Sequence, residues 1–391
     1  MDFDVVIIGA GAAGLMCAIE AGRRGRKVVL LDHAKKIGEK IRISGGGRCN
    51  FTNRQVSKEN FISSNPPFCI SILKKYTPQD FIERISSHGI QWHEKTLGQL
   101  FCNGSSKEII EMLRDELVGA NVTLILECKI LEVKLTKGKY NINTSKIKII
   151  SDNLVIATGG KSIPKMGATD LGYKIAESFG INLIETKPAL VPLTFAPGEL
   201  KTMSLLSGNS VFASASNKKI SFTEGLLFTH RGLSGPSILQ ISSYWNEGET
   251  ITIDLLNEHN ILKLLIKLRT QNGKISIKNA VARFLPTKIA ELILDQLDIK
   301  GNLGDQSNLT LEAIRQAIHD WNIKPTGSEG YRTAEVTLGG VDTKELDSRT
   351  METKKIKGLY FIGEVVDVTG WLGGYNFQWA WSSGWVSGQA V

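Results

Sequence analysis

The sequence predicts an α/β protein in which both ends of the chain contribute to one parallel β-sheet. Two observations carry this prediction. The first 32 residues have the pattern of strand, glycine-rich turn, helix and strand, and residues 358–386 have the pattern of strand, glycine-rich turn and helix again. Strands that alternate with helices are typical of a parallel sheet. Because the two segments stand at opposite ends of the chain, we expect the middle to be inserted into this domain.

The opening segment has the order of elements that binds a dinucleotide. Asp4–Ile8 is an aliphatic run whose length suits a buried strand, and residues 9–14 fit G-x-G-x-x-G. Leu15–Arg24 is expected to be a helix, and Lys27–Leu31 a second strand that ends on Asp32. The motif alone is weak evidence, but here all the parts follow in register. The alternative is a glycine-rich turn in an ordinary α/β domain.

Each part of this segment has a physical role in the predicted site. Gly9 permits a tight turn, Gly11 lets a pyrophosphate approach the backbone, and Gly14 lets the helix pack closely on the sheet. The phosphates would lie at the positive end of the helix dipole, and Asp32 would accept hydrogen bonds from ribose hydroxyls. The cofactor contacts predicted here are Gly9, Gly11, Ala12, Ala13, Gly14 and Asp32.

Composition places the chain among globular proteins. Its 391 residues are 42% hydrophobic and 22% charged, and no apolar run is long enough to span a bilayer. A strand is expected within four residues of the N-terminus, which argues against a signal peptide. The five cysteines are scattered and never spaced C-x-x-C, which argues for a reducing cytoplasm and against structural zinc.

The formal net charge is +8. A solvated lysine-rich face explains it most simply, and an acidic or phosphorylated substrate would also suit it. Nucleic acid is not favoured as a partner, because no motif of interleaved aromatic and basic residues accompanies the charge. The sequence leaves the oligomeric state open.

A second glycine-rich stretch follows Asp32. Three consecutive glycines at 45–47 suit a backbone that approaches a ligand closely, and the residues around them offer hydrogen-bond donors. The alternative is a flexible surface loop. The cofactor contacts predicted here are Lys40, Ser44, Gly45, Gly46, Gly47, Arg48, Cys49 and Asn50.

The rest of the first half continues the α/β pattern. Helices are predicted from Pro78 to Gly89, where Thr77 is the cap, from the capping box at Ser105 to Gly119, and over Thr169–Gly180. The predicted strands are Val122–Leu126, Lys129–Leu135, Tyr140–Ile150 and Leu154–Gly160. The cofactor contacts predicted in this part are Ile130, Thr158, Gly159 and Gly160.

The composition changes at Lys187–Leu193, where two prolines flank an apolar run and mark a crossover into a new domain. Val211–Phe222 has the pattern of a strand, and residues 259–322 are mostly helical in pattern. The predicted domains are a discontinuous cofactor domain (1–188 and 334–391), an inserted β-rich substrate-side domain (189–255 and 323–333) and a helical subdomain (256–322).

The C-terminal segment favours FAD over NAD, because NAD would require only the first glycine motif. The ribityl chain and isoalloxazine of FAD extend beyond the pyrophosphate and need a second set of contacts. Glu364 and Asp367 are rivals for the ribityl hydroxyls, and the glycine-rich turn before a helix at Phe377–Val386 would face the N1/C2 edge of the flavin. The cofactor contacts predicted here are Gly363, Glu364, Asp367, Gly373, Gly374, Tyr375 and Asn376.

Several of these segments carry a family resemblance. Ile43–Asn53, Thr229–Pro236, Thr337–Val341 and Gly363–Gly384 resemble the BaiN-like (YhiN-like) FAD-dependent oxidoreductases, a family that includes aminoacetone oxidase. The resemblance covers essentially the whole chain. It implies an FAD-binding domain with glutathione-reductase/fumarate-reductase-like connectivity, an inserted β-rich domain and a helical subdomain. Phe101-Cys102 departs from the Phe-Pro of the family, and the substrate is not implied.

The chemistry predicted from these patterns is hydride transfer between a small-molecule substrate and flavin N5. NAD(P)H, bound transiently, or oxygen would be the second redox partner. The alternatives are a flavin-dependent tRNA-modifying protein and a non-catalytic flavin-binding protein. The catalytic residue is not identified: His230 is either a proton donor or a turn residue, and Cys49 either touches the flavin or fills space. His88 and His93 do not form a metal site in this pattern.

Overall fold

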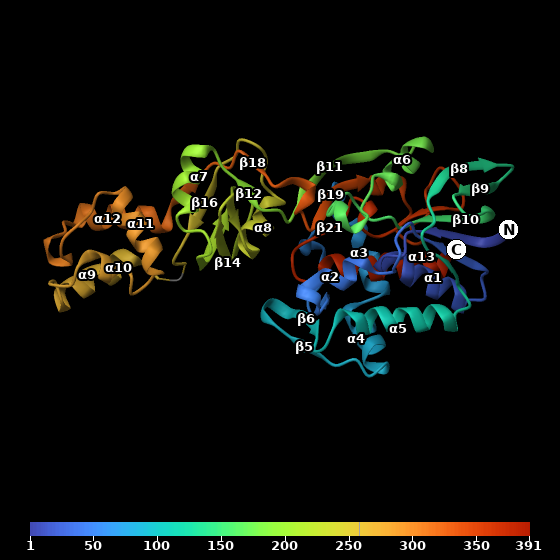
Figure 1. Cartoon of the computed structure of the whole chain (residues 1–391), viewed down its shortest axis with the longest axis horizontal. Helices are drawn as coiled ribbons and strands as arrows, with labels where there is room; N and C mark the ends of the chain where they lie inside the picture. The colour runs from blue at the N-terminus through green and yellow to red at the C-terminus, as the bar shows by residue number, and fades with distance from the viewer. Residues whose placement is uncertain (258) are drawn as a thin grey trace. The chain divides into compact units, whose positions relative to one another are not determined.

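The computed structural model describes residues 1–257 and 259–391, which form two compact units. The discontinuous unit comprises Met1–Lys187 and Val336–Val391, and the inserted unit comprises Pro188–Glu335. Both ends of the chain belong to the discontinuous unit, where the first and last elements lie together (Figure 1). No helix among the described residues is both long enough and apolar enough to cross a membrane.

The discontinuous unit is built on a seven-stranded sheet with β1 at its centre. β1 pairs in parallel with β2 on one side and with β10 on the other, and its aliphatic residues Val5–Ile8 are buried. β7 extends the sheet beyond β2, while β20 and the antiparallel hairpin of β8 and β9 lie beyond β10. These strands are β1 (Asp2–Ile8), β2 (Val28–Leu31), β7 (Thr123–Ile125), β8 (Ile130–Thr136), β9 (Lys139–Thr144), β10 (Lys148–Ile156) and β20 (Leu359–Phe361).

Two predicted strands are divided in the structure. The strand predicted over Val211–Phe222 falls in the antiparallel pair β13 (Ser210–Ser216) and β14 (Ser221–Thr229). Instead of a strand over Tyr140–Ile150, β9 ends at Thr144, and β10 begins at Lys148 and continues to Ile156. The cause is a side-chain turn: the Thr144 hydroxyl accepts the N–H groups of Lys146 and Ile147 at 3.1 and 2.9 Å. Thr and Ser hydroxyls commonly close such turns, so the break follows from local chemistry.

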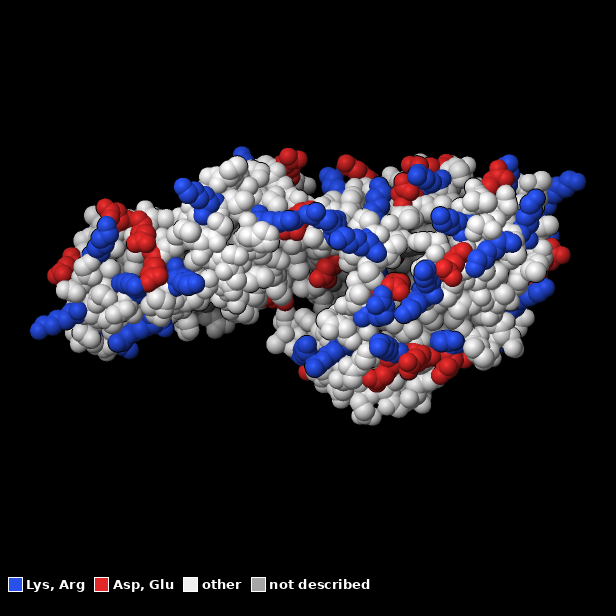
Figure 2. All heavy atoms as spheres, in the orientation of Figure 1, with Lys and Arg blue, Asp and Glu red and all other residues white. Residues whose placement is uncertain are grey.

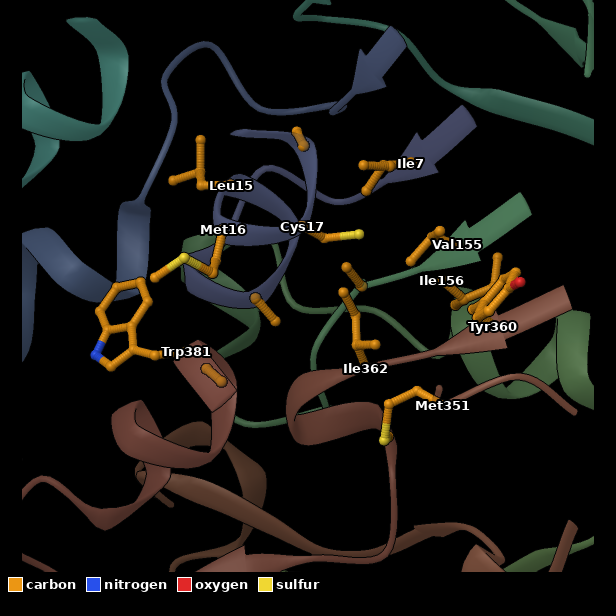
Figure 3. Close-up of a cluster of buried hydrophobic side chains, with 14 of the residues drawn as sticks. Ile7, Leu15, Met16, Cys17, Val155, Ile156, Met351, Tyr360, Ile362 and Trp381 are labelled. Atoms are coloured by element: carbon orange, nitrogen blue, oxygen red, sulfur yellow. The ribbon is translucent and has the colours of Figure 1, made fainter. Parts of the chain in front are cut away.

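Helices α1 and α13, from opposite ends of the sequence, pack side by side in the core (Figure 1). A Cβ on Gly384 would lie 2.4 Å from the Ala13 carbonyl oxygen, so α13 approaches α1 closely there. Figure 3 shows Met16 directed towards Trp381 of α13, and Cys17 towards Val155 of β10. The helices of this unit are α1 (Ala12–Arg23), α2 (Glu39–Gly47), α3 (Phe68–Lys75), α4 (Pro78–Ser87), α5 (Ser106–Gly119), α6 (Leu171–Ser178) and α13 (Tyr375–Ala390).

Three small sheets complete the discontinuous unit. They join segments that are far apart in the sequence, as in the pairing of residues 61–62 with 369–370. The first contains β3 (Asn50–Asn53), β5 (Trp92–Glu94) and β6 (Gln99–Cys102), the second β4 (Phe61–Ile62) and β21 (Thr369–Gly370), and the third β11 (Leu183–Ala189) and β19 (Val336–Val341).

The inserted unit has an antiparallel sheet of its own, and helices α9–α12 leave it after β16 and return before β17. Its strands are β12 (Leu193–Thr194), β13 (Ser210–Ser216), β14 (Ser221–Thr229), β15 (Gly232–Ser234), β16 (Ile251–Asp254), β17 (Trp321–Ile323) and β18 (Gly327–Ser328). Its helices are α7 (Pro197–Ser204), α8 (Pro236–Ser242), α9 (Ile261–Gln271), α10 (Ile277–Val281), α11 (Thr287–Gln296) and α12 (Asn308–His319). The three-domain division proposed from the sequence remains a prediction.

Candidate functional site

The three motif glycines have different surroundings. Gly9 has φ +112°, and a Cβ there would lie 2.3 Å from the Ala157 carbonyl oxygen. A Cβ on Gly14 would lie 1.9 Å from the Gly9 carbonyl oxygen. A Cβ on Gly11 would meet nothing within 4 Å. The fold itself therefore requires Gly9 and Gly14, whereas Gly11 leaves an open space at the start of α1.

The first turn of α1 offers backbone donors to that space. Gly11 is the N-cap and has no side chain to accept from the turn, and the first i to i−4 bond of the helix is donated by Leu15. The N–H groups of Ala12, Ala13 and Gly14 therefore lack intrahelical acceptors, as at every helix N-terminus. These groups and the helix dipole favour an anion here.

Asp32 holds the same turn from the end of β2. Its carboxylate accepts the Ala10 N–H at 2.6 Å and the Ala34 N–H at 2.8 Å. Because a carboxylate has about four acceptor positions, these two bonds leave capacity for hydroxyl groups. Asp32 also borders a cavity of about 40 Å³ at the carboxyl ends of β1, β2 and β10. The cavity is lined by Gly9, Asp32, Ile130, Thr158 and their neighbours.

Further residues line this cavity beyond the cofactor contacts predicted from the sequence, and they include His33, Cys128, Thr169 and Leu171. His33 directly follows Asp32, and Cys128 lies two residues before Ile130, which begins β8. Position at the carboxyl end of a strand is the signal that could have identified His33, because ligands of open parallel sheets bind at that edge.

A charged cluster joins four segments at the same edge of the sheet. Glu364 accepts from Lys40 Nζ at 2.7 Å, from Ser162 Oγ at 2.8 Å and from the Thr337 N–H at 3.0 Å. A Cβ on Gly160 would lie 2.4 Å from Thr337 Oγ1, and one on Gly159 would lie 3.8 Å from Glu364 Oε2, so both glycines lie against the cluster. The side chains of Lys40 and Glu364 are 32% and 18% exposed, so the pair is open to a ligand on one side.

The two acids that compete for the ribityl chain differ in environment. Asp367 is 2% exposed and accepts the Ser64 N–H at 2.8 Å. Burial raises the pKa of the Asp367 carboxyl, although the Ser64 hydrogen bond acts against it. Asp367 therefore anchors an internal loop, whereas Glu364 is the acid at the open edge. Gly363, beside Glu364, lies against the Ala13 side chain of α1.

The second glycine stretch is the end of a helix rather than a loop alone. α2 includes residues 44–46 in non-helical conformations, and β3 begins at Asn50. The space beyond Gly46 and Gly47 is open, whereas a Cβ on Gly45 would meet the Phe101 ring at 2.7 Å. Ser44 donates to the Ile41 carbonyl oxygen. Arg48 is exposed, and within the described residues its guanidinium makes no hydrogen bond or ion pair.

Cys49 follows this stretch as a buried side chain with φ +49°. Burial raises the pKa of its thiol to about 12, although a hydrogen bond with Ser44 acts in the opposite direction. The thiolate is the reactive form of cysteine. We therefore expect iodoacetamide at pH 7.5 to leave Cys49 unmodified in the native protein and to modify it after unfolding, as measured by peptide mass spectrometry. Rapid native labelling of Cys49 would show an accessible thiolate and contradict this burial.

The C-terminal turn is held by its own side chains. Gly374 has φ +95°, and a Cβ there would lie 2.3 Å from the Thr52 carbonyl oxygen. The Asn376 amide donates to the Gly370 carbonyl oxygen and accepts the Gly370 N–H, both at 2.8 Å. Tyr375 is buried with its ring edge-on to Phe61. The first i to i−4 bond of α13 is donated by Gln378, so the N–H groups of Asn376 and Phe377 lack intrahelical acceptors. The predicted flavin contacts of the Asn376 and Tyr375 side chains stay predictions.

Gly373 and Asn50 complete this turn. Gly373 has φ +119° and its carbonyl oxygen accepts from Asn53 Nδ2 at 3.0 Å, while the Asn50 side chain lies beside Gly374. β3 and the start of α13 are thus in direct contact, which brings the two predicted glycine-rich segments together within the discontinuous unit. Substitution of Gly374 would disturb this packing, so it would not isolate a cofactor contact.

The three histidines considered in the sequence have different surroundings. His88 Nε2 lies 3.2 Å from Glu116 Oε1, and His93 Nδ1 lies 2.7 Å from Asn103 Oδ1. His230 is exposed in the turn between β14 and β15 of the inserted unit. Within the described part of the chain, no three or more His, Cys, Asp or Glu side chains form a group that could hold a metal ion.

The parallel sheet, the open space at Gly11 and the acid at Asp32 define a Rossmann-type dinucleotide-binding domain, as the sequence predicts. Residues 3–390 match the family model described as HI0933-like protein Rossmann domain, and the chain belongs to that family. It is an FAD-dependent oxidoreductase. The α/β Rossmann-like fold, the FAD cofactor and the enzyme class predicted from the sequence are therefore confirmed.

Relatives extend over the whole chain. The ribosomal RNA dihydrouridine synthase of Escherichia coli (strain K12) is 50% identical over 99% of this chain and 97% of its own. The 3-dehydro-bile acid delta(4,6)-reductase of Clostridium scindens is 28% identical over 98% of both chains. The solved 3-ketosteroid delta1-dehydrogenase of Sterolibacterium denitrificans has 14% identity and a TM-score of 0.54 over 100% of this chain and 99% of that one, and shows the fold alone. The resemblance to aminoacetone oxidase stays a prediction.

Proposed function

We propose that this protein is an rRNA dihydrouridine synthase, which reduces the C5=C6 bond of uridine in ribosomal RNA. The observation that carries the proposal is the 50% identity, over 99% of this chain and 97% of the relative, to a protein of that name. The relative is matched over both units, so the similarity includes the inserted unit and not only the cofactor fold. The net charge of +8 is compatible with an RNA substrate.

We propose the following roles for the cofactor-facing residues. The first turn of α1, with Gly11 as its N-cap, would hold the pyrophosphate, and Asp32 would hold the adenosine ribose beside Ile130. Glu364, held in position by its hydrogen bond from Lys40, would accept hydrogen bonds from the ribityl hydroxyls next to Gly159 and Gly160. Backbone N–H groups at the start of α13 would stabilise negative charge at the flavin N1/C2 edge.

The bound flavin would supply a hydride to uracil C6, and a proton added at C5 would complete the reduction. The role of the protein in this scheme is to hold the cofactor and to keep water from the reacting edge. Arg48, an exposed cation on the glycine stretch, is free to contact an anionic substrate. NAD(P)H would restore the reduced flavin by transient binding, because the sequence contains no second G-x-G-x-x-G motif.

This proposal changes two expectations drawn from the sequence. RNA takes the place of the small molecule as the favoured substrate class, and nucleic acid becomes a partner. Ribosomal rather than transfer RNA is favoured because the full-length relative is named for ribosomal RNA. The location proposed for the protein is the cytoplasm, where ribosomal RNA is found.

Deletion of the gene is expected to remove dihydrouridine from ribosomal RNA and to leave the dihydrouridine of transfer RNA unchanged. The measurement is nucleoside mass spectrometry of the two purified RNA classes. Purified holoenzyme with NADPH, added to ribosomal RNA from the deletion strain, should restore the product. Loss confined to transfer RNA would support the tRNA alternative, and unchanged levels in both classes would refute an RNA substrate.

A further inference from the structure

Charge is strongly segregated in helices α9–α12 of the inserted unit. Residues 259–290, which include α9 and α10, contain seven Lys and Arg and no Asp or Glu, whereas residues 291–320 contain six Asp and Glu and two basic residues. Figure 2 shows Lys and Arg along the lower edge of this region, where α9 and α10 lie, and acids along its upper edge over α11 and α12.

Most basic side chains of this segment have no partner in the fold. Arg269 bonds to the Gln306 carbonyl oxygen and to Asn308, and Lys278 pairs with Glu291. The other five are exposed and, among the described residues, make no hydrogen bond or ion pair. They are Lys263, Lys267, Lys274, Arg283 and Lys288, and we call them the basic surface. By contrast, Lys300 and Arg315 on the acidic side are both paired.

The spacing on α9 suits a phosphate backbone. Lys263 and Lys267 are four residues apart, so they stand on the same face of α9 with their Cβ atoms about 5–6 Å apart. The opposite face of α9 is buried through Ile261, Leu265 and Leu268. Asn272 and Asn279 are exposed nearby and offer hydrogen-bond donors of the kind that contact phosphate and sugar.

We propose that the basic surface, which α9, the loops on either side of α10 and the start of α11 carry, binds the phosphate backbone of ribosomal RNA and holds the substrate on the inserted unit. This inference rests on the proposed function, and it assigns to the helical segment the role of RNA docking. The proposal follows from the concentration of one sign of charge without internal partners, since an ordinary solvated face mixes both signs. Phosphate contacts of this kind supply affinity without reading sequence.

An anionic membrane is a less suitable occupant. A membrane-surface helix needs an exposed apolar face beside its basic face, and the apolar face of α9 is enclosed in the fold. RNA needs only exposed cations and donors, which this segment provides.

The test is a triple charge reversal, Lys263→Glu with Lys267→Glu and Lys274→Glu, in the full-length holoenzyme. The probe is protein-free ribosomal RNA from the deletion strain, and binding is measured by filter retention at several salt concentrations. We expect an affinity loss on the order of tenfold or more and a shallower salt dependence, because each lost phosphate contact removes about 0.7–0.9 from the slope of log K against log salt. Dihydrouridine formation should fall, with the flavin spectrum and melting temperature unchanged.

Two controls make the result specific. Lys201→Glu with Lys218→Glu and Lys219→Glu removes the same charge from exposed lysines elsewhere in the inserted unit and should preserve binding. Lys→Arg at the three tested positions keeps the charge and should also preserve it. An equal loss of RNA affinity in both charge-reversal variants would mean that net charge alone explains the effect, and it would overturn the proposal.

The remaining outcomes separate this inference from the proposed function. If the wild-type enzyme forms dihydrouridine and the triple variant binds and reacts equally well, the docking surface lies elsewhere while the function stands. If the wild-type enzyme forms no dihydrouridine in ribosomal RNA, the proposed function itself fails. Variant-sensitive binding to vesicles of phosphatidylglycerol, with unchanged RNA binding, would overturn the RNA assignment in favour of a membrane.

Discussion

Gly11→Val is expected to give a folded protein that retains no FAD. A Cβ at position 11 meets no protein atom within 4 Å, and Gly11 has φ −83°, which a β-branched residue can adopt. The valine would instead fill the space over the first turn of α1, where the pyrophosphate would approach the backbone. The measurements are flavin absorbance after gel filtration and the melting temperature of the apoprotein, compared with wild-type protein stripped of FAD.

The surrounding glycines provide the controls for this experiment. Gly119 in α5 also has open space around its Cβ position, so Gly119→Val should retain FAD. Gly9→Ala introduces a Cβ 2.3 Å from the Ala157 carbonyl oxygen at a positive φ, so it should unfold the protein rather than affect the cofactor alone. If Gly11→Val retained FAD at the wild-type ratio, the pyrophosphate would lie elsewhere.

The local parts of the fold could be predicted because short-range physics determines them. The Val5–Ile8 run, the turn at Gly9 and the acid after β2 all occur within one continuous segment, and their roles depend on neighbouring residues. The helix starts at Thr77 and Ser105 could be predicted for the same reason, since each cap is formed with a residue three positions away.

The parts that could not be predicted depend on contacts between distant residues. The charged cluster pairs Lys40 with Glu364, which is 324 residues away, and adds Ser162 from a third segment. The close approach of α13 to α1 depends on Gly384 and Gly388, whose pattern indicates a helix but not its partner. The sequence could not distinguish the roles of Glu364 and Asp367. Their burial in the folded chain does so, because Glu364 is partly exposed at the open edge and Asp367 is buried.

A buried ionic network holds α1, which carries the cofactor turn, against α4 and α5. Arg84 of α4 contacts Glu116 of α5 at 2.6 Å and Glu20 of α1 at 2.9 Å, and these three side chains are 9%, 5% and 10% exposed. Burial alone would raise the pKa of Glu116. The hydrogen bonds and charge of Arg84, with smaller contributions from Arg23 and His88, outweigh burial and hold the pKa below its usual value. Arg84 therefore offsets the free-energy cost of burying the Glu20 and Glu116 carboxylates.

Arg84→Met is expected to lower the free energy of unfolding by about 3–5 kcal/mol at pH 7, because it removes the buried cation that Glu20 and Glu116 share and leaves the more exposed Arg23 as the remaining arginine beside them. The depressed pKa of Glu116 stabilises the wild-type fold above the unfolded value of about 4.3, and this contribution is lost as the pH falls through the folded pKa. In the variant, burial would raise that pKa, so its stability should recover relative to wild type on acidification. Urea denaturation at pH 7 and pH 4 measures both effects.

The control is Arg54→Met, which breaks an exposed pair with Glu94 and should lower the free energy of unfolding by less than about 1 kcal/mol at both pH values. A similar small loss for Arg84→Met would mean that the buried network contributes no more than a surface ion pair.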